Sequence, residues 1–232
     1  YSQRGSLIWT EPRGLDAGYD VPQYSIHRGE LQMLLYEAVV ERLGTENVYT
    51  GHHLAGFDQD EEGVTAYFID RKTGISIGSY HGDMLIGADG IMSQARQAFY
   101  PDEGVPVYSG LILWRGIVET EPYLDGRTMI MVGNNTRKAV IYPVSKRSMD
   151  KGKSLVNWIA ERPVPMDLPP QKEDWNRPGN KADFEDFFKT WHFSWLNIPN
   201  LIDITSSIYE FPMIDRDPIP QWSFGRVTLL GA

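Results

Sequence analysis

The residues best suited to chemistry in this sequence are polar side chains at the ends of predicted strands and helices. Asp89 and Gly90 follow a short apolar run, Met84–Ala88, and precede a helix that opens near Ser93. An apolar run without polar alternation is typical of a strand covered on both faces, as in an α/β sheet. Ligands of such sheets bind beyond the carboxyl ends of the strands, where Asp89 lies. Taken alone, the segment favours the alternative, a turn in which Asp and Gly serve only the turn.

A second candidate is Arg28, at the start of the clearest predicted helix. Apolar residues recur at helical spacing from Leu31 to Leu43, and Gly44 is a natural stop. A cation at a helix N-terminus opposes the helix dipole unless an anion is also present. Free N–H groups together with an arginine suit a phosphate. The alternative, equally open from this segment, is a surface arginine bonded to a nearby carboxylate.

A third group lies on strands that follow Pro101, where the pattern changes to successive strands with short connections and no helices between them. This pattern predicts an antiparallel meander, and so a second layer or domain. Trp114, Arg115 and Tyr142 are the candidate ligand contacts, because an aromatic sheet face can form half of an apolar pocket. An arginine beside an aromatic wall suits a carboxylated aromatic, although core packing for the aromatics and a solvent position for Arg115 remain alternatives. The predicted strands are Val107–Glu119, Thr128–Val132, Lys138–Val144 and Ser154–Glu161.

The remaining elements are read from the same periodicities. Val64–Asp70 and Ile75–Tyr80 form a predicted hairpin that turns at residues 72–74. Arg162–Gly179, which holds five prolines, predicts an irregular connector. Phe184–Trp191 carries a helical stripe of aromatic residues. The other predicted elements are strands at Ser6–Trp9, Asn47–Phe57, Ser206–Met213 and Arg226–Gly231, and a short helix at Trp195–Ile204 disturbed by Pro199.

Composition limits the classes of partner. The hydrophobic content of 41% and the charged content of 23% are ordinary for a globular protein. The net charge of −9 argues against nucleic acid or an anionic membrane surface as the main partner, but leaves room for an anionic cofactor held by a few arginines. No apolar run approaches the roughly 18 residues that a membrane helix needs. The chain has no cysteine, which fits a reducing compartment, and we expect a cytoplasmic location.

The histidines do not predict a metal site. His52 and His53 are adjacent, so on a strand their side chains would point to opposite faces. His27, His81 and His192 show no ligand spacing either. We therefore expect no metal.

Three motifs occur in order along the chain: Ser25–Gln32, Gly87–Arg96, and Asp215–Arg216 followed by Gly225–Gly231. Any one of them alone would be weak. Together, separated by a hairpin and then by aromatic strands, they resemble the single-component FAD-dependent aromatic hydroxylases, the family of para-hydroxybenzoate and salicylate hydroxylases. Within that family the resemblance is strongest to the bacterial phenazine hydroxylases, and it covers essentially the whole chain.

The resemblance implies roles for particular residues. Arg28 would contact the FAD pyrophosphate and Gln32 the ribityl side of the flavin. Asp89 would be the acidic residue of the family's Asp-Gly motif, tied to the pyrophosphate and to use of the nicotinamide cofactor. The meander would be the substrate domain, with its sheet forming one wall against the flavin ring. Because the flavin carries the chemistry, no catalytic side chain is expected.

The expected fold class is α/β (α+β), a partial FAD-binding domain of the aromatic-hydroxylase type with an antiparallel or mixed β-sheet substrate domain. We expect residues 1–24 to form a strand and loop near the substrate domain. Residues 25–100 would be part of the FAD-binding domain, residues 101–214 the substrate domain with its helices, and residues 215–232 a return to the FAD-binding domain.

The sequence also departs from the family pattern. The family begins with a strand–Gly-x-Gly-x-x-Gly–helix unit for the ADP half of FAD, and this motif does not occur here. The family's later Gly-Asp-Ala-Ala-His motif would start at Gly231, where the next residue is Ala232. We therefore expect these 232 residues, in isolation, to be a fragment that binds FAD weakly or not at all.

The predicted function is that of a flavin monooxygenase that hydroxylates an aromatic or N-heteroaromatic substrate with FAD, NAD(P)H and O₂. Its partners would be a small aromatic molecule and O₂, and a homodimer is compatible with the sequence. The alternative is a cofactor-free fragment that serves as a binding or assembly module.

Overall fold

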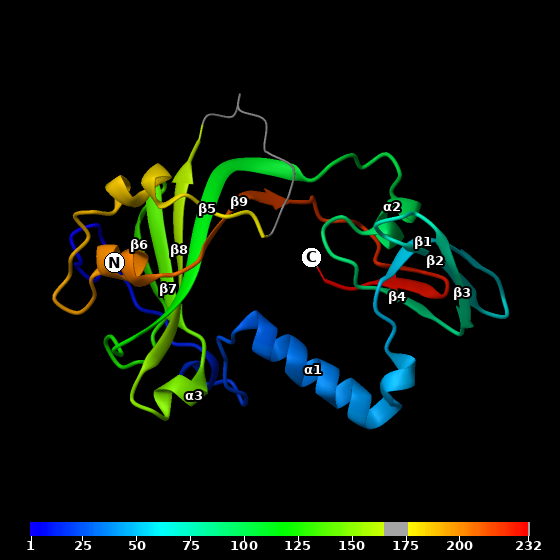
Figure 1. The fold of residues 1–232 in the computed structure, drawn as a ribbon, viewed down its shortest axis with the longest axis horizontal. Helices are drawn as coiled ribbons and strands as arrows, with labels where there is room; N and C mark the ends of the chain where they lie inside the picture. Colours follow the sequence, from blue (N-terminus) through cyan, green and yellow to red (C-terminus); the bar gives the residue numbers. More distant parts are fainter. Residues whose placement is uncertain (165–175, 232) are drawn as a thin grey trace. The chain divides into compact units, whose positions relative to one another are not determined.

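The computed structural model describes residues 1–164 and 176–231, and the chain folds into two compact units. The first unit joins Tyr1–Leu35 to Tyr108–Met213, and the second joins Tyr36–Val107 to Ile214–Ala232. Each unit is therefore built from two stretches of chain that are distant in sequence (Figure 1). Among the described residues, no helix has both the length and the apolar character needed to cross a membrane. The middle of the predicted connector, residues 165–175, lies outside the described residues.

A five-stranded sheet forms the centre of the first unit, in the order β6-β7-β8-β5-β9. The antiparallel pairs β6–β7 and β7–β8 confirm the predicted meander for three of its four strands (Figure 1). The first predicted strand, β5, is antiparallel to β8 and does not pair with β6. One short helix, α3 (Lys146–Met149), lies between β7 and β8, where none was predicted. The strands are β5 (Val107–Thr120), β6 (Ile130–Asn134), β7 (Arg137–Pro143), β8 (Ser154–Pro163) and β9 (Ile208–Asp215).

One face of this sheet carries the hydrophobic core. Trp114, Trp158 and Ile141 point to this face, and none of them is more than 3% exposed. Successive residues of a strand point to opposite faces, so Arg115, which follows Trp114, belongs to the other face. Both indole N–H groups of the core face are paired: Trp114 donates to Glu210 and Trp158 donates to Thr205. The two indole rings are thus shielded from water, and neither leaves an unpaired N–H group in the core.

The segment that covers the core face differs from its prediction. Phe184, Phe188 and Trp191 are fully buried in the core, as a helical stripe would be. However, this segment forms no α-helix: it contains two short 3₁₀ turns, η3 (Lys181–Asp183) and η4 (Glu185–Phe187). Phe184 and Phe188 flank η4, and Trp191 follows it. The backbone at Phe184, with φ of −140°, breaks the helix between the two turns.

The short helix that follows confirms a second helical prediction. α4 (Ile198–Ile204) is capped by Asn197, whose side chain accepts a hydrogen bond from the N–H of Asn200. Pro199 lies in the first turn, where its missing N–H costs nothing, so it does not disturb the helix.

The strand predicted at Ser6–Trp9 is wrong, because these residues form no strand in the structure. Leu7, Ile8 and Trp9 are 59–70% exposed, so the apolar run found no partner strand among the described residues. A short 3₁₀ turn, η1 (Gly14–Ala17), follows in the same loop.

The second unit contains two small sheets. β1 (His52–Gln59), β2 (Val64–Asp70) and β3 (Ser76–Gly82) are antiparallel, which confirms the predicted hairpin. The preceding strand begins at His52 and not at Asn47, because η2 (Thr45–Asn47) occupies the start of that segment.

The other sheet of this unit contains part of the apolar run Met84–Ala88, which was predicted to be a strand. β4 (Leu85–Gly87) pairs in parallel with β11 (Val227–Leu229), which also pairs with β10 (Ser223–Phe224). Within the described residues β4 is covered on one face only. Gly87 packs against α2 (Gln94–Phe99), whereas Ile86 is 55% exposed, so the expectation of cover on both faces is wrong for this part of the chain.

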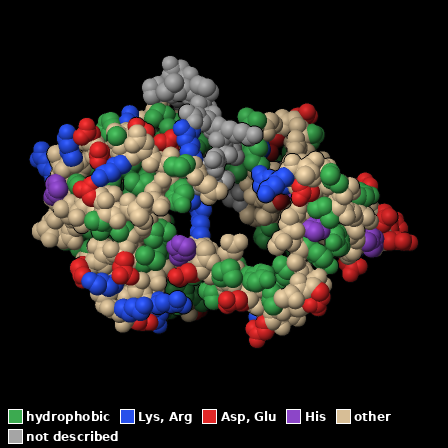
Figure 2. Space-filling view, viewed as in Figure 1, with side chains coloured by type: hydrophobic (Ala, Val, Ile, Leu, Met, Phe, Trp, Pro, Cys, Tyr) green, Lys and Arg blue, Asp and Glu red, His purple; other side chains and the backbone are tan. Residues whose placement is uncertain are grey.

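The predicted helix α1 (Arg28–Leu43) is confirmed, and Gly44 ends it with φ of +84°. The boundary between the two units falls inside this helix. None of its residues is buried, and Leu31, Leu34 and Leu35 are 40–59% exposed. Figure 2 shows hydrophobic side chains on the surface over α1.

Candidate functional site

Asp89 lies at the carboxyl end of β4, as the sequence predicts, and caps the helix that follows. Its carboxylate accepts hydrogen bonds from the Ser93 hydroxyl at 2.5 Å and from the N–H groups of Gln94 and Ala95 at 2.7 and 3.3 Å. Gly90 makes the turn with φ of +77°. The geometry therefore matches the turn alternative, and a contact between Asp89 and a cofactor stays a prediction.

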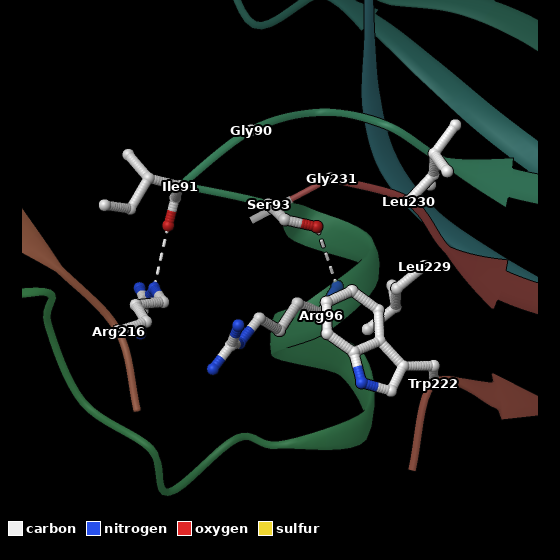
Figure 3. A pocket seen from close by; sticks show the side chains of 10 residues that line it. Gly90, Ile91, Ser93, Arg96, Arg216, Trp222, Leu229, Leu230 and Gly231 are labelled. Atoms are coloured by element: carbon white, nitrogen blue, oxygen red, sulfur yellow. Dashed lines mark hydrogen bonds between the residues drawn. The ribbon is translucent and has the colours of Figure 1, made fainter. Parts of the chain in front are cut away.

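A small hollow lies where β4 and β11 end side by side (Figure 3). Its volume is about 20 Å³, roughly the room that one water molecule needs. Glycine backbone borders it, and no atom lies within 4 Å of the position that a Cβ would take at Gly90 or Gly231. The backbone of these two glycines is therefore open to the surroundings.

Two arginines that border this hollow share one carboxylate. Arg96 donates to Glu103 through Nε and Nη2, and Arg216 donates to the same carboxylate at 3.0 Å. Arg216 also holds the carbonyl oxygen of Ile91, the residue after the Asp89–Gly90 turn, at 2.7 Å (Figure 3). Hydrogen bonding from Arg96 is the main reason that the pKa of Glu103 falls below its usual value.

These contacts fix the turn of the second unit from two sides. Asp89 anchors it to α2, and Arg216 anchors it to the return segment of the chain. Since Glu103 offsets part of the charge of both arginines, this cluster holds the loop in place and offers little free positive charge for an anion.

Arg28 and Gln32 lie in the first turns of α1, and both are exposed. The start of the helix is tied to the end of β7, because the N–H of His27 donates to the carbonyl oxygen of Val144 at 3.1 Å. The His27 ring accepts a hydrogen bond from the N–H of Glu30 and so caps the helix. Within the described residues, the side chain of Arg28 makes no hydrogen bond or ion pair.

Arg115 lies on the sheet face opposite the core. Its guanidinium carbon is 4.8 Å from the ring centre of Phe211, a cation–π contact. Partial burial lowers the pKa of Arg115, and the nearby positive charge of Arg28 lowers it further. Among residues 1–164 and 176–231, no carboxylate pairs with it. Two cations thus lie near each other without an anion between them, which is the electrostatic pattern of an anion site.

The three predicted substrate contacts divide between the two faces of the sheet. Tyr142 is half-buried and lies with Arg115 on the face of the sheet opposite the core, here called the open face. Trp114 lies on the core face, where its ring stacks on Phe184 with the centres 4.9 Å apart. The structure therefore places Arg115 and Tyr142 on one face of the sheet, with Arg28 near enough to lower the pKa of Arg115, and directs Trp114 into the core.

Sequence reasoning missed Phe211, the aromatic ring under Arg115. The signal was available in the predicted strand Ser206–Met213, where Tyr209 and Phe211 are two residues apart and so share a face. What the sequence could not give is the pairing of that strand with β5.

Known proteins resemble this chain in sequence over most of its length. A family model described as FAD binding domain matches residues 17–176. The phenazine 1,6-dicarboxylic acid hydroxylase PhzS of Lysobacter antibioticus is 42% identical over 229 residues, 98% of this chain and 56% of that protein. The aurachin C monooxygenase/isomerase of Stigmatella aurantiaca is 30% identical over 98% of this chain and 53% of its own length.

Solved structures show the same fold. The crystal structure of an HpxO variant of Klebsiella pneumoniae complexed with FAD superposes with a TM-score of 0.65 at 25% identity, covering 93% of this chain and 50% of that one. The chain thus spans about half the length of the curated relatives that it matches.

Proposed function

Because the chain belongs to the FAD binding domain family, we propose that it is part of an FAD-dependent monooxygenase that hydroxylates a carboxylated aromatic or N-heteroaromatic ring. In the balanced reaction the ring C–H, O₂, NAD(P)H and a proton give the ring C–OH, NAD(P)⁺ and water. NAD(P)H is the proposed reductant. Support comes from the 42% identity to a phenazine dicarboxylic acid hydroxylase over nearly the whole chain.

When bound, FAD supplies the redox chemistry, accepting the hydride and delivering oxygen to an electron-rich ring. The chain's own residues bind and orient. The residue that best fits the cofactor is Arg28, which is exposed at a helix start and has no counter-ion among the described residues. A diphosphate would complete this arrangement, since both the helix N-terminus and the guanidinium favour an anion. Gln32, one turn later, would meet the ribityl side.

Asp89 could contribute to cofactor binding in two ways, through its own carboxylate and through the turn that it holds. A carboxylate has about four lone-pair sites, so the three hydrogen bonds inside the fold leave room for one more donor from a ligand. The turn also presents Gly90 without any atom near its missing Cβ, so a ligand could approach the backbone there closely.

The substrate class rests on one observation, the half-buried guanidinium of Arg115. A partly buried cation without a carboxylate partner in the described residues is costly unless a ligand supplies the anion. Phe211 provides an aromatic surface beside it, and Tyr142 adds a hydroxyl on the same face. A flat aromatic acid offers the carboxylate for Arg115 and a ring for Phe211. Trp114 is left out of this proposal, because its ring and N–H are already engaged in the core.

A direct test measures FAD binding by the chain, or by a longer protein that contains it. Stoichiometric uptake of FAD, seen as a visible flavin absorption band, supports the proposal. Arg28→Ala should weaken FAD binding by about 10-fold to 100-fold, the range for a lost charged hydrogen bond. Arg42→Ala, at the opposite end of the same helix, is the matched control and should bind as the wild type does.

The outcomes separate the two candidate functions. A folded protein that takes up no FAD in either form would contradict the monooxygenase and favour a cofactor-free binding module. Uptake that is the same in wild type and Arg28→Ala would leave the monooxygenase standing and refute the phosphate role of Arg28.

A further inference from the structure

An amide without a partner lies in the middle of the first unit's sheet. Asn157 on β8 is 9% exposed, and its Nδ2 is buried without a hydrogen-bond partner in the described part of the chain. Buried amide groups are nearly always paired, and an unpaired donor lowers the stability of the fold. A donor retained in this state needs an explanation.

The register of the strands places Asn157 on the face of Arg115. Asn157 lies directly opposite Tyr142 on β7 and opposite Ile117 on β5. Arg115 lies opposite Ile159, two residues along the same strand. Asn157 and Arg115 are therefore diagonal neighbours across β8 and β5, a spacing that long side chains span readily.

The polar group next to Asn157 on the core face of β8 is paired. The N–H of Trp158, the residue next to Asn157, donates to the Thr205 hydroxyl at 2.8 Å. That hydroxyl in turn donates to the carbonyl oxygen of Leu201 at 2.6 Å. The indole N–H of Trp158 and the Thr205 hydroxyl are thus both paired within the fold, whereas the Ser154 hydroxyl, at the start of β8 on the same face, is buried without a partner. On the opposite face, the side chains of Arg115, Tyr142 and Asn157 have no hydrogen bond between one another or to any other described residue.

We propose that Asn157 is a substrate-binding residue whose Nδ2 donates a hydrogen bond to the ring carboxylate held by Arg115. This inference rests on the proposed function and deepens it. Asn157 fixes the carboxylate from the β8 side, and the ring then lies across the sheet between β7 and β9. A charged acceptor compensates both the unpaired amide and the unpaired guanidinium in one step. Asn157 would thereby favour aromatic acids over aromatic rings that lack a carboxylate.

The test compares binding and stability in three proteins, the wild type, Asn157→Leu and Ser154→Ala, each in the form of the protein that takes up FAD. Leu keeps the size of Asn without the amide. Ser154 is the matched control, because its hydroxyl is also buried without a partner but lies three residues away, on the other face of β8. Phenazine-1,6-dicarboxylate is titrated calorimetrically in excess FAD, with unsubstituted phenazine as the second probe. Thermal unfolding is followed without any ligand.

The expected result is a 10-fold to 100-fold loss of phenazine-1,6-dicarboxylate affinity in Asn157→Leu. Its unfolding temperature should equal or exceed that of the wild type, since no structural hydrogen bond is lost. Ser154→Ala should bind as the wild type does, and unsubstituted phenazine should not distinguish the three proteins. If Leu does not fold, Asn157→Ala replaces it, with the same loss of affinity expected.

Two results would overturn the inference alone. One is dicarboxylate affinity within twofold of wild type in Asn157→Leu. The other is a lower unfolding temperature together with equal losses for both probes, which would give the amide a structural role. A wild type that binds neither probe would instead overturn the proposed function, and the inference with it.

Discussion

The two units use pairs of arginines in opposite ways. In the second unit Arg96 and Arg216 converge on Glu103, and all three side chains are largely buried. In the first unit Arg28 and Arg115 lie close enough for one charge to lower the pKa of the other, and no described carboxylate lies between them. The first arrangement is complete within the fold. The second lacks an anion.

This difference distinguishes a cluster that holds the fold together from a site that can bind a ligand. A carboxylate that belongs to the chain fixes two segments together, so the Glu103 cluster holds the turn after Asp89. An uncompensated pair of cations is unfavourable in the free protein and gains most when an anionic ligand arrives. The same contrast holds across the five-stranded sheet: on one face Trp114 donates to Glu210, and on the other Arg115 contacts Phe211 but has no carboxylate partner among the described residues.

The largest expected effect comes from breaking the complete cluster. Glu103→Ala leaves two largely buried guanidiniums without their shared anion, so the free energy of unfolding should fall by about 2–4 kcal/mol. Chemical denaturation measures this. Asp102→Ala, an exposed neighbour, should change stability by less than about 0.5 kcal/mol. Equal effects of the two substitutions would contradict a structural role for the cluster.

The next effect is on binding and leaves stability nearly unchanged. Arg115→Leu removes a partly buried charge and its cation–π contact, two changes that oppose each other, so the free energy of unfolding should move by less than about 1 kcal/mol. Affinity for phenazine-1,6-dicarboxylate should fall about 10-fold to 100-fold. Arg147→Leu, an exposed arginine of α3, controls for loss of net charge. If calorimetry finds unchanged affinity in Arg115→Leu, the anion site is not there.

A smaller effect is expected on the core face. Trp114→Phe keeps an aromatic ring against Phe184 but removes the donor to Glu210, and should cost about 1–2 kcal/mol of stability. Ligand affinity should stay at the wild-type value. Loss of affinity at constant stability would show that the ring of Trp114 contacts the ligand after all.

The smallest effect is a pH dependence of the cluster. The pKa of Glu103 is lower in the folded protein than its ordinary value of 4.5, mainly because Arg96 donates to it. A lowered folded pKa gives stability that is complete above the unfolded pKa and lost as the pH falls through the folded pKa. The stability difference between wild type and Glu103→Gln should therefore be constant near pH 6–7 and shrink below about pH 4.5. A difference that grows towards acid pH would contradict this.

Much of the fold could be predicted because hydrophobic periodicity reports local structure. The helix from Arg28 to Leu43 and the strands of the first unit followed from spacing, but the pairing of β5 with β8 in place of β6 did not. The strand prediction for Ser6–Trp9 was wrong, because an apolar run becomes a strand only when a partner strand is present. The helix predicted over Phe184–Trp191 was wrong, because burial of aromatic residues at helical spacing does not require an α-helix.

The site was predictable in part. Strand alternation alone could have separated Trp114 from Arg115, since adjacent residues never share a sheet face. Asn157 could not be found, because a buried amide without a partner is a property of the packed structure and not of the sequence. Nor could the sharing of Glu103, since Arg216 lies 113 residues away along the chain.

The central claim is that the open face of the five-stranded sheet binds an anionic ligand, whereas the arginines of the Glu103 cluster are already paired within the fold. It is tested most directly by nitrogen NMR of the arginine side chains during titration with phenazine-1,6-dicarboxylate in excess FAD. The Nε–H signals of Arg96 and Arg216 should be protected from solvent exchange in the free protein and should not move. The Nε–H signal of Arg115 should exchange rapidly when free, then shift and become protected on binding. Movement at Arg96 and Arg216 with no change at Arg115 would contradict the account.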